Sequence, residues 1–177
     1  MENRNEWKKS MTPLRPAAVL VPLITRKNGL TVMLTRRNEQ LKNHAGQISF
    51  PGGSVDDNDR NPTHTALRET EEEIGLDPDC IKIIGSLDEY IVGTGYLVNP
   101  IIGSVKPPFK LIRQEDEVSE IFEVPLDYLI QPTNFERYSR YFNGKMRHHL
   151  AIKWKDYFIW GATAGILRNL SQRLQTS

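Results

Sequence analysis

The feature that most constrains the fold is a helix whose two ends are both encoded in the sequence. Asn61 is a suitable N-cap, and Pro62 suits the first helical position. At the other end, Gly75 is placed to close the helix in a left-handed conformation, and Pro78 follows soon after. The sequence therefore predicts a helix over residues 62–74, with segments of a different character on either side.

The segments that flank this helix are typical of β-strands. Residues 17–24 and 30–36 are rich in β-branched side chains and are separated by the turn signal Asn28-Gly29, which predicts a β-hairpin. Residues 46–53 predict a short strand that runs into a glycine turn. Further strands are predicted at residues 81–87, 97–105, 118–126 and 149–154.

A second long helix is predicted over residues 161–175. Its apolar stripe is typical of core packing and consists of Ala164, Leu167, Leu170 and Leu174. A mixed sheet with two helices follows, which makes the fold class α/β (α+β), a sandwich of helices and sheet. Because the chain has no internal repeat and no low-complexity linker, we expect a polar arm at residues 1–12 and a single domain at 13–177.

Charge and composition exclude several function classes. The formal net charge of +1 provides no bulk field that would steer the protein to nucleic acid or to an anionic membrane. No segment approaches the roughly 18 apolar residues of a membrane span, and the N-terminus lacks the apolar core of a signal peptide. The single cysteine, Cys80, cannot form an internal disulfide, which fits a reducing compartment. We expect a cytoplasmic protein without nucleic-acid or membrane partners.

The predicted helix carries an unusual group of carboxylates. Glu69, Glu72 and Glu73 stand at i, i+3 and i+4, so they share one helix face, whereas Glu71 points elsewhere. Like charges at these spacings destabilise an isolated helix by roughly 0.2–0.5 kcal/mol per pair. The alternative of a solvated acidic face is disfavoured because Arg68 is the only basic neighbour and the helix dipole favours cations here. Carboxylate oxygens suit Mg²⁺ or Mn²⁺, so the cluster predicts a metal site.

Residues 53–76 resemble the Nudix box, whose consensus is G-x5-E-x7-R-E-U-x-E-E-x-G-U, where U is an aliphatic residue. The second half matches at Arg68, Glu69, Glu72, Glu73, Gly75 and Leu76, while Thr70 replaces the usual aliphatic residue. The first half matches only if one extra residue is allowed, which places Gly53 at the glycine and Asp59 at the first acidic position. The resemblance implies a Nudix-type α/β/α sandwich and a metal-dependent hydrolase of phosphorus anhydrides.

Residues 33–53 resemble the segment that precedes the box in the coenzyme A pyrophosphatase branch of this family. The matching positions are Leu34, Thr35, Arg37, Gly46, Phe50, Pro51, Gly52 and Gly53. Two positions depart from it, because Lys42 stands where arginine is usual and Asn38-Glu39 replaces a small pair. The lysine keeps the charge but loses bidentate phosphate geometry. The C-terminal segment 158–167 is also similar to that branch.

The resemblance also implies roles for individual residues. Metal ligation would fall to Glu69, Glu72, Glu73 and the Gly52 carbonyl, with Arg68 orienting the glutamates. The catalytic set would be Glu69, Glu72, Glu117 and Arg68, and Glu69, Glu72 and Glu117 all remain open as the general base. Substrate contacts would come from Arg36, Arg37, Lys42, Gly46, Phe50 and Gly53. The basic members suit a substrate with a 3′-phosphate as well as a diphosphate.

Three functions remain open at this point. The first is hydrolysis of coenzyme A or its derivatives to 3′-phosphoadenosine 5′-phosphate and 4′-phosphopantetheine, with Mg²⁺ or Mn²⁺. The second is hydrolysis of another nucleoside diphosphate, such as ADP-ribose or a dinucleoside polyphosphate. The third is a Nudix-fold binding module without catalysis, which the presence of all three box glutamates disfavours. Each predicts a small-molecule partner, and a homodimer is compatible with the sequence.

Overall fold

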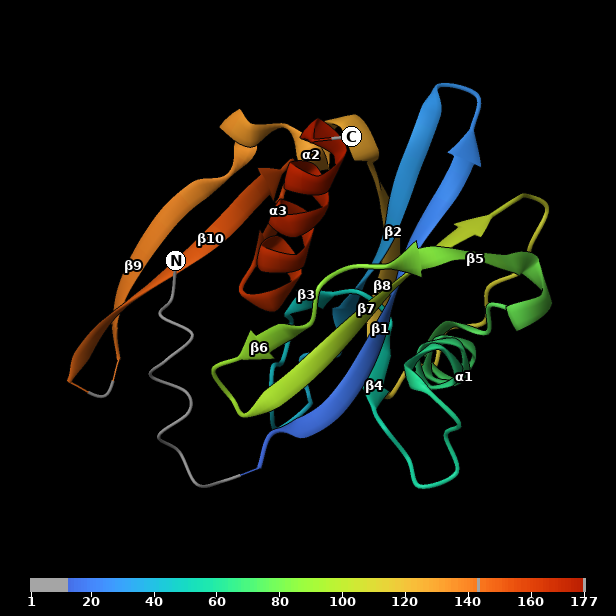
Figure 1. The fold of residues 1–177 in the computed structure, drawn as a ribbon, viewed down its shortest axis with the longest axis horizontal. Coiled ribbons are helices and arrows are strands. Elements are labelled where there is room, and N and C mark those ends of the chain that lie inside the picture. The colour runs from blue at the N-terminus through green and yellow to red at the C-terminus, as the bar shows by residue number, and fades with distance from the viewer. Residues whose placement is uncertain (1–12, 143, 177) are drawn as a thin grey trace.

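The computed structural model describes residues 13–142 and 144–176, so the predicted arm at residues 1–12 lies outside the described residues. The main body is a mixed β-sheet with helices on both faces (Figure 1). Its strands are β1 (Arg15–Arg26), β2 (Gly29–Arg37), β3 (Ile48–Ser49), β4 (Gly52–Ser54), β5 (Ile81–Ser86), β6 (Tyr90–Val92), β7 (Tyr96–Val105) and β8 (Val118–Pro125). The predicted fold class is confirmed.

Strand β1 is the centre of this sheet. It pairs in parallel with β7 and antiparallel with β2 and β4, and β2 in turn pairs antiparallel with β3 and β8. The predicted hairpin of β1 and β2 is therefore confirmed. The glycine turn predicted at the end of residues 46–53 is instead a strand. Gly52 and Gly53 belong to β4 and pair with Val19 and Ala18 of β1.

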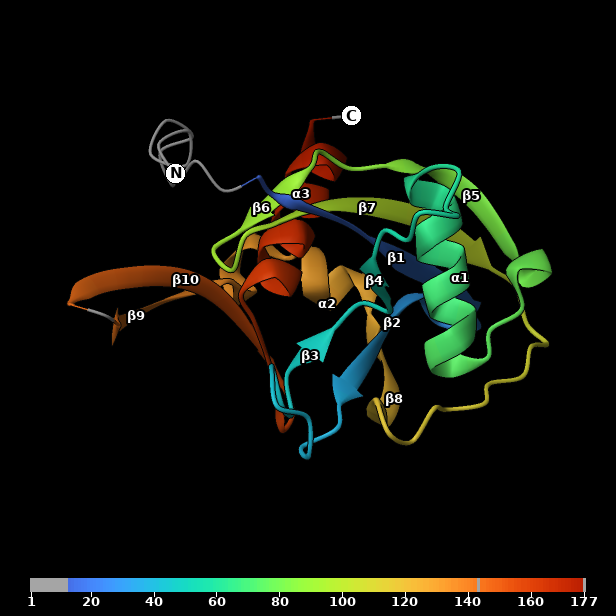
Figure 2. The same cartoon turned by 90° about the horizontal axis from the view of Figure 1, so that it is seen from below.

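The apolar run of β1 is explained by burial on both faces of the sheet. Ala17, Val21 and Leu23 pack into one core cluster, while the alternate residues Ala18 and Leu20 pack into the other. The first cluster also contains residues of α3 (Ala162–Gln175) and of the short helix α2 (Leu126–Ile130), and the second contains residues of α1 (Pro62–Ile74). Figure 2 shows α1 and α3 on opposite sides of the sheet.

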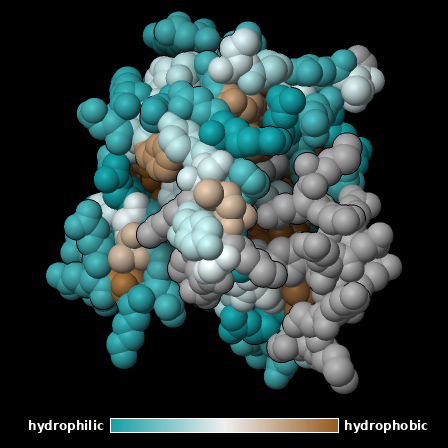
Figure 3. All heavy atoms as spheres, turned by 90° about the vertical axis from the view of Figure 1, so that its left-hand side faces the viewer, coloured by the Kyte–Doolittle hydropathy of each residue, from teal (hydrophilic) through white to brown (hydrophobic). Residues whose placement is uncertain are grey.

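A second sheet lies beside the first and was only partly predicted. It consists of β9 (Glu136–Phe142), β10 (Lys145–Trp154) and β11 (Tyr157–Trp160), joined antiparallel in the order β11-β10-β9. Only the end of β10 was expected as a strand. Its surface residues Tyr141, Met146 and Phe158 are exposed. Figure 3, which views the molecule from the left of Figure 1, shows a mostly hydrophilic described surface with small, separate hydrophobic patches.

Two details of the predicted elements need correction. Leu174 was assigned to the buried stripe of the last helix but is 49% exposed, because it lies near the end of α3, beyond the sheet. The strand predicted over 118–126 ends at Pro125, where α2 begins. Two short 3₁₀ turns, Pro78–Cys80 and Pro132–Asn134, complete the fold. Within the described residues, no helix is long and apolar enough to cross a membrane.

Candidate active site

Helix α1 has the ends that the sequence predicts. The side chain of Asn61 accepts a hydrogen bond from the backbone N–H of His64 at 2.9 Å, and Gly75 closes the helix at φ 65°. The bounds, residues 62–74, are confirmed. The carbonyls of Glu73 and Ile74 accept hydrogen bonds from the backbone N–H groups of Gln114 and Ile112 at 2.9 and 2.8 Å. The segment before β8 is therefore tied to the end of the acidic helix.

The three glutamates that share a helix face differ strongly in burial. Glu73 is 5% exposed and lies against β4, where its carboxylate accepts a hydrogen bond from the Gly52 N–H at 3.3 Å. The Glu69 side chain is 19% exposed, and that of Glu72 is 60% exposed. Glu71 is exposed on another side of the helix. The acidic face thus runs from solvent at Glu72 into the protein at Glu73.

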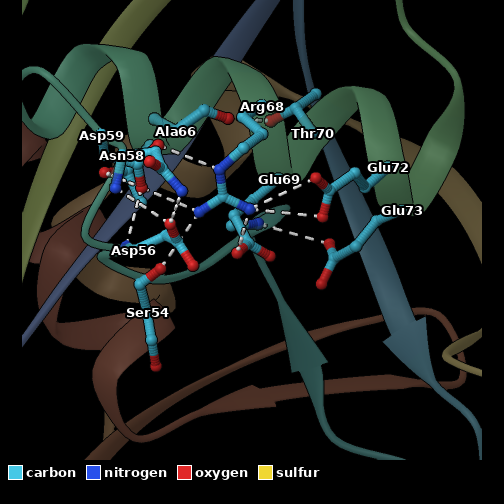
Figure 4. Close-up of polar contacts among 12 residues, drawn as sticks. Ser54, Asp56, Asn58, Asp59, Ala66, Arg68, Glu69, Thr70, Glu72 and Glu73 are labelled. Carbon is cyan, nitrogen blue, oxygen red and sulfur yellow. Dashed lines mark hydrogen bonds and ion pairs between the residues drawn. The ribbon is translucent and has the colours of Figure 1, made fainter.

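Arg68 connects this face to the loop that follows β4 (Figure 4). Its Nε and Nη2 atoms donate to the two carboxylate oxygens of Asp59 at 2.9 and 2.8 Å. Its Nη1 donates to Glu69 at 2.8 Å and to Glu72 at 3.3 Å. A bidentate arginine–carboxylate pair fixes the guanidinium plane, so the remaining nitrogen is aimed at the two glutamates. This geometry suits the orienting role that the resemblance implies for Arg68.

Asp59 is the residue whose role the one-residue insertion left open. Its side chain is fully buried, and besides Arg68 it accepts a hydrogen bond from the Thr65 hydroxyl at 2.9 Å. The hydrogen bonds from Arg68 hold the pKa of Asp59 well below its usual range. Asp59 therefore serves as the partner of Arg68, and the extra residue lies between the two in sequence.

Burial also changes the acidity of the glutamates themselves. It raises the pKa of Glu73 to about 8, although the N–H of Gly52 and the charge of Arg37 both lower it. It raises the pKa of Glu69 as well, against the opposing effect of Arg68. The negative charge of Glu117 also raises the pKa of both groups. A cation bound at this face would stabilise the ionised glutamates, and it would therefore offset both their burial and the repulsion between them.

The glycines of β4 leave the space that this face needs. A Cβ atom on Gly53 would collide with the carboxylate of Glu69, and one on Gly52 would collide with the backbone of β1. Gly52 also has a backbone φ of 150°, which residues with a side chain rarely adopt. The strand therefore lies directly against the carboxylates because it has no side chains there.

The candidate metal ligands suit a divalent cation chemically, but the structure does not hold them around one common point. Within the described residues, no group of three or more His, Cys, Asp or Glu side chains is placed closely enough to hold a metal ion. Glu69 and Glu72 instead meet at the Nη1 atom of Arg68, and the Glu73 carboxylate accepts a hydrogen bond of 3.3 Å from the Gly52 N–H. All candidate donors are hard oxygens, which Mg²⁺ and Mn²⁺ prefer. Side-chain rotations would have to bring them together around a cation.

The two arginines at the end of β2 point to opposite faces of the sheet. Arg37 acts electrostatically on Glu73, on the side of α1. Arg36 instead forms an ion pair with Glu120 at 3.2 Å and lies 5.3 Å from the centre of the Tyr157 ring, on the side of α3. The pairing of β2 with β8 shifts register between these two residues, but their contacts still lie on different faces of the sheet, so they do not form one basic cluster. The sequence analysis did not identify Glu120 and Tyr157 as the neighbours of Arg36, because neither residue belongs to a recognisable motif.

The other residues predicted to bind substrate also lie in different surroundings from one another. Lys42 is exposed in the loop 38–47, and no residue in the described ranges forms an ion pair with it. Gly46 closes that loop through a hydrogen bond from its N–H to the Arg37 carbonyl at 3.2 Å, with φ 67°. Phe50 is 3% exposed and packs in the core, which argues against a contact between its side chain and a substrate. Substrate contacts at these positions stay predictions.

Comparisons with known proteins agree with the geometry. A NUDIX domain family model matches residues 14–143. The uncharacterized Nudix hydrolase NudL of Escherichia coli K12 is 41% identical over 162 residues, covering 90% of this chain and 83% of that protein, and NudL of Shigella boydii matches to the same extent.

Two solved structures share the fold at low identity. The Nudix hydrolase RenU from M. smegmatis aligns with a TM-score of 0.55 at 20% identity, covering 66% of this chain and 73% of that one. An Ap4A hydrolase from C. elegans aligns with a TM-score of 0.54 at 18% identity, covering 63% and 80%.

Proposed function

Because this chain belongs to the Nudix family and is a Nudix hydrolase, we propose that it cleaves the diphosphate of coenzyme A or a derivative. Water attacks one phosphorus atom, the bridging P–O bond breaks, and the products are 3′-phosphoadenosine 5′-phosphate and 4′-phosphopantetheine. Mg²⁺ or Mn²⁺ would be the cation, since Nudix hydrolases generally use divalent metal ions.

The observation that carries the choice of substrate is the position of Arg37. Its Nε atom, like that of Arg36, is buried and has no hydrogen-bond partner among the described residues, but only Arg37 of these two acts electrostatically on Glu73. A buried, unpaired guanidinium N–H is costly unless a ligand supplies an acceptor. Phosphate oxygens are suitable acceptors, and coenzyme A has a 3′-phosphate in addition to its diphosphate. The match of residues 33–53 to the coenzyme A branch supports the same substrate.

The residues of the site divide the work of hydrolysis. Glu69, Glu72, Glu73 and the Gly52 carbonyl would hold the cation, which neutralises phosphate charge and lowers the pKa of water when bound. Arg68 orients two of these glutamates through its Nη1 atom. A carboxylate beside them would accept the proton of the attacking water, and Glu69, Glu72 and Glu117 are the three candidates.

A substrate panel tests this proposal directly. We expect hydrolysis of coenzyme A in the presence of Mg²⁺ or Mn²⁺, no turnover after addition of chelator, and the two expected products on chromatography. ADP-ribose and a dinucleoside polyphosphate are the comparison substrates. Good hydrolysis of either of these without any hydrolysis of coenzyme A would reject the substrate but not the enzyme class. Undiminished turnover in chelator would reject the metal site.

Replacing Arg37 by alanine tests the contact with the 3′-phosphate. A hydrogen bond to a charged group contributes roughly 1.5–3 kcal/mol, so kcat/KM for coenzyme A should fall about ten- to a hundred-fold. Dephospho-coenzyme A lacks the 3′-phosphate, and its hydrolysis should change little. Arg36→Ala is the matched control, because the Arg36 guanidinium lies on the other face of the sheet, beside Glu120 and the Tyr157 ring. An equal loss on both substrates would instead assign Arg37 to the diphosphate.

A further inference from the structure

Asn38 forms an unusual set of hydrogen bonds to the segment that carries Glu117. Its backbone N–H donates to the carbonyl of Glu117 at 2.8 Å, and its side-chain amide donates to the carbonyl of Glu115 at 2.7 Å. Its side-chain oxygen in turn accepts a hydrogen bond from the N–H of Gln40 at 2.9 Å. One residue therefore binds both ends of the segment 115–117 and also fixes its own side chain.

The residue that precedes this segment, Gln114, is attached to the acidic helix. The N–H of Gln114 donates to the Glu73 carbonyl at 2.9 Å, and the N–H of Glu117 donates to the Gln114 carbonyl at 3.1 Å. The backbone that carries Glu117 is thus held between the end of α1 on one side and Asn38 on the other. Among the described residues, none forms a hydrogen bond or ion pair with the Glu117 carboxylate, which is exposed. The position of this carboxylate therefore depends on the backbone that carries Glu117.

Asparagine is suited to this position because it donates and accepts at the same time. Aspartate could still accept from Gln40, but it could not donate to the Glu115 carbonyl. Alanine would lose both side-chain bonds and keep only the backbone bond to Glu117. Each substitution therefore loosens the segment 115–117 without removing any carboxylate of the candidate site.

We propose that Asn38 is a positioning residue for Glu117, which it holds at the acidic face by fixing the segment 115–117. The proposal rests on the proposed function only in assigning Glu117 a role in hydrolysis, and it does not depend on which diphosphate is the substrate. It gives a role to Asn38, a departure from the coenzyme A pattern in the sequence that the proposed reaction leaves unexplained.

A double-mutant cycle tests this role with the best substrate of the panel. Asn38→Ala is expected to lower kcat about tenfold with little change in KM, since small displacements of a reacting group are costly. Asn38→Asp should lose as much, because the bond to Glu115 is absent there too. In the Glu117→Gln background, Asn38→Ala should have no further effect. Independent, multiplicative effects of the two changes would overturn the proposal, whichever substrate is cleaved.

Hydrogen exchange supplies a measurement that does not need turnover. In the metal-free protein, Asn38→Ala should speed the exchange of backbone amides in residues 114–118. Asn134→Ala is the matched control, because Asn134 also donates its side-chain amide to a carbonyl, that of Tyr128 at 2.9 Å. The control should leave both kcat and the exchange of residues 114–118 unchanged. Unaltered exchange in Asn38→Ala would show that Asn38 does not hold this segment.

Discussion

Replacing Glu69 or Glu73 by glutamine is expected to lower kcat by about 10² or more while the protein still folds. Glutamine keeps the shape of the side chain and removes the charge that a divalent cation needs. Glu73 lies against Gly52, and Glu69 fills the space above Gly53. Because β4 has glycines at these two positions, it offers no side chain there that could take over the role of either carboxylate. Steady-state kinetics with saturating Mg²⁺ measures the loss, and circular dichroism verifies the fold.

Glu71→Gln is the matched control for these two variants. Glu71 lies on the same helix and carries the same charge, but it is exposed on another side. We expect it to retain near-normal turnover. If Glu69→Gln and Glu73→Gln also retain near-normal turnover, the acidic face is solvated and takes no part in hydrolysis.

The metal-free protein is expected to lose stability as the pH rises from about 5 to above 8. The reason is that burial raises the pKa of Glu73 to about 8 from its ordinary value of 4.5. Below 4.5 both the folded and the unfolded state hold the proton, and between the two values only the folded state does. The free energy of unfolding therefore falls with pH across this window. The total is of the order of a few kcal/mol, since one pKa unit corresponds to about 1.4 kcal/mol.

Urea denaturation at a series of pH values in chelator measures this effect. Glu73→Gln cannot titrate, so most of the slope should disappear in that variant and its stability should exceed that of the parent protein above pH 8. Added Mg²⁺ should stabilise the parent most at high pH, because it binds the ionised carboxylate. A parent protein whose stability is flat between pH 5 and 8 would contradict the burial of a neutral Glu73.

The parts of the fold that local sequence signals determine could be predicted. The helix α1 has a cap at each end, and β1 has a continuous apolar run because both of its faces are buried. The second sheet was only partly predicted, for a different reason. Strand β9 has the polar sequence ERYSRYF, which shows no clear apolar alternation, so it was not recognised as a strand although the turn signal Asn-Gly follows it at residues 143–144.

The candidate site shows the same division. The spacing of Glu69, Glu72 and Glu73 places them on one helix face, but it cannot say that Glu73 is buried and Glu72 exposed, because that depends on where β4 packs. The prediction also grouped Arg36 with Arg37 as substrate contacts, whereas the structure places Arg36 beside Glu120, on the face opposite Glu73, and Arg37 on the face of Glu73.

The bidentate contact between Arg68 and Asp59 has a consequence for how such sites change over evolution. The two side chains meet across the start of α1, so the turn between them only has to span a fixed gap. One inserted residue can bulge outward there without displacing either partner, since lengthening a surface turn costs little. A chain with a longer turn at this point can therefore preserve the same pair, and a pattern with fixed spacing would overlook it.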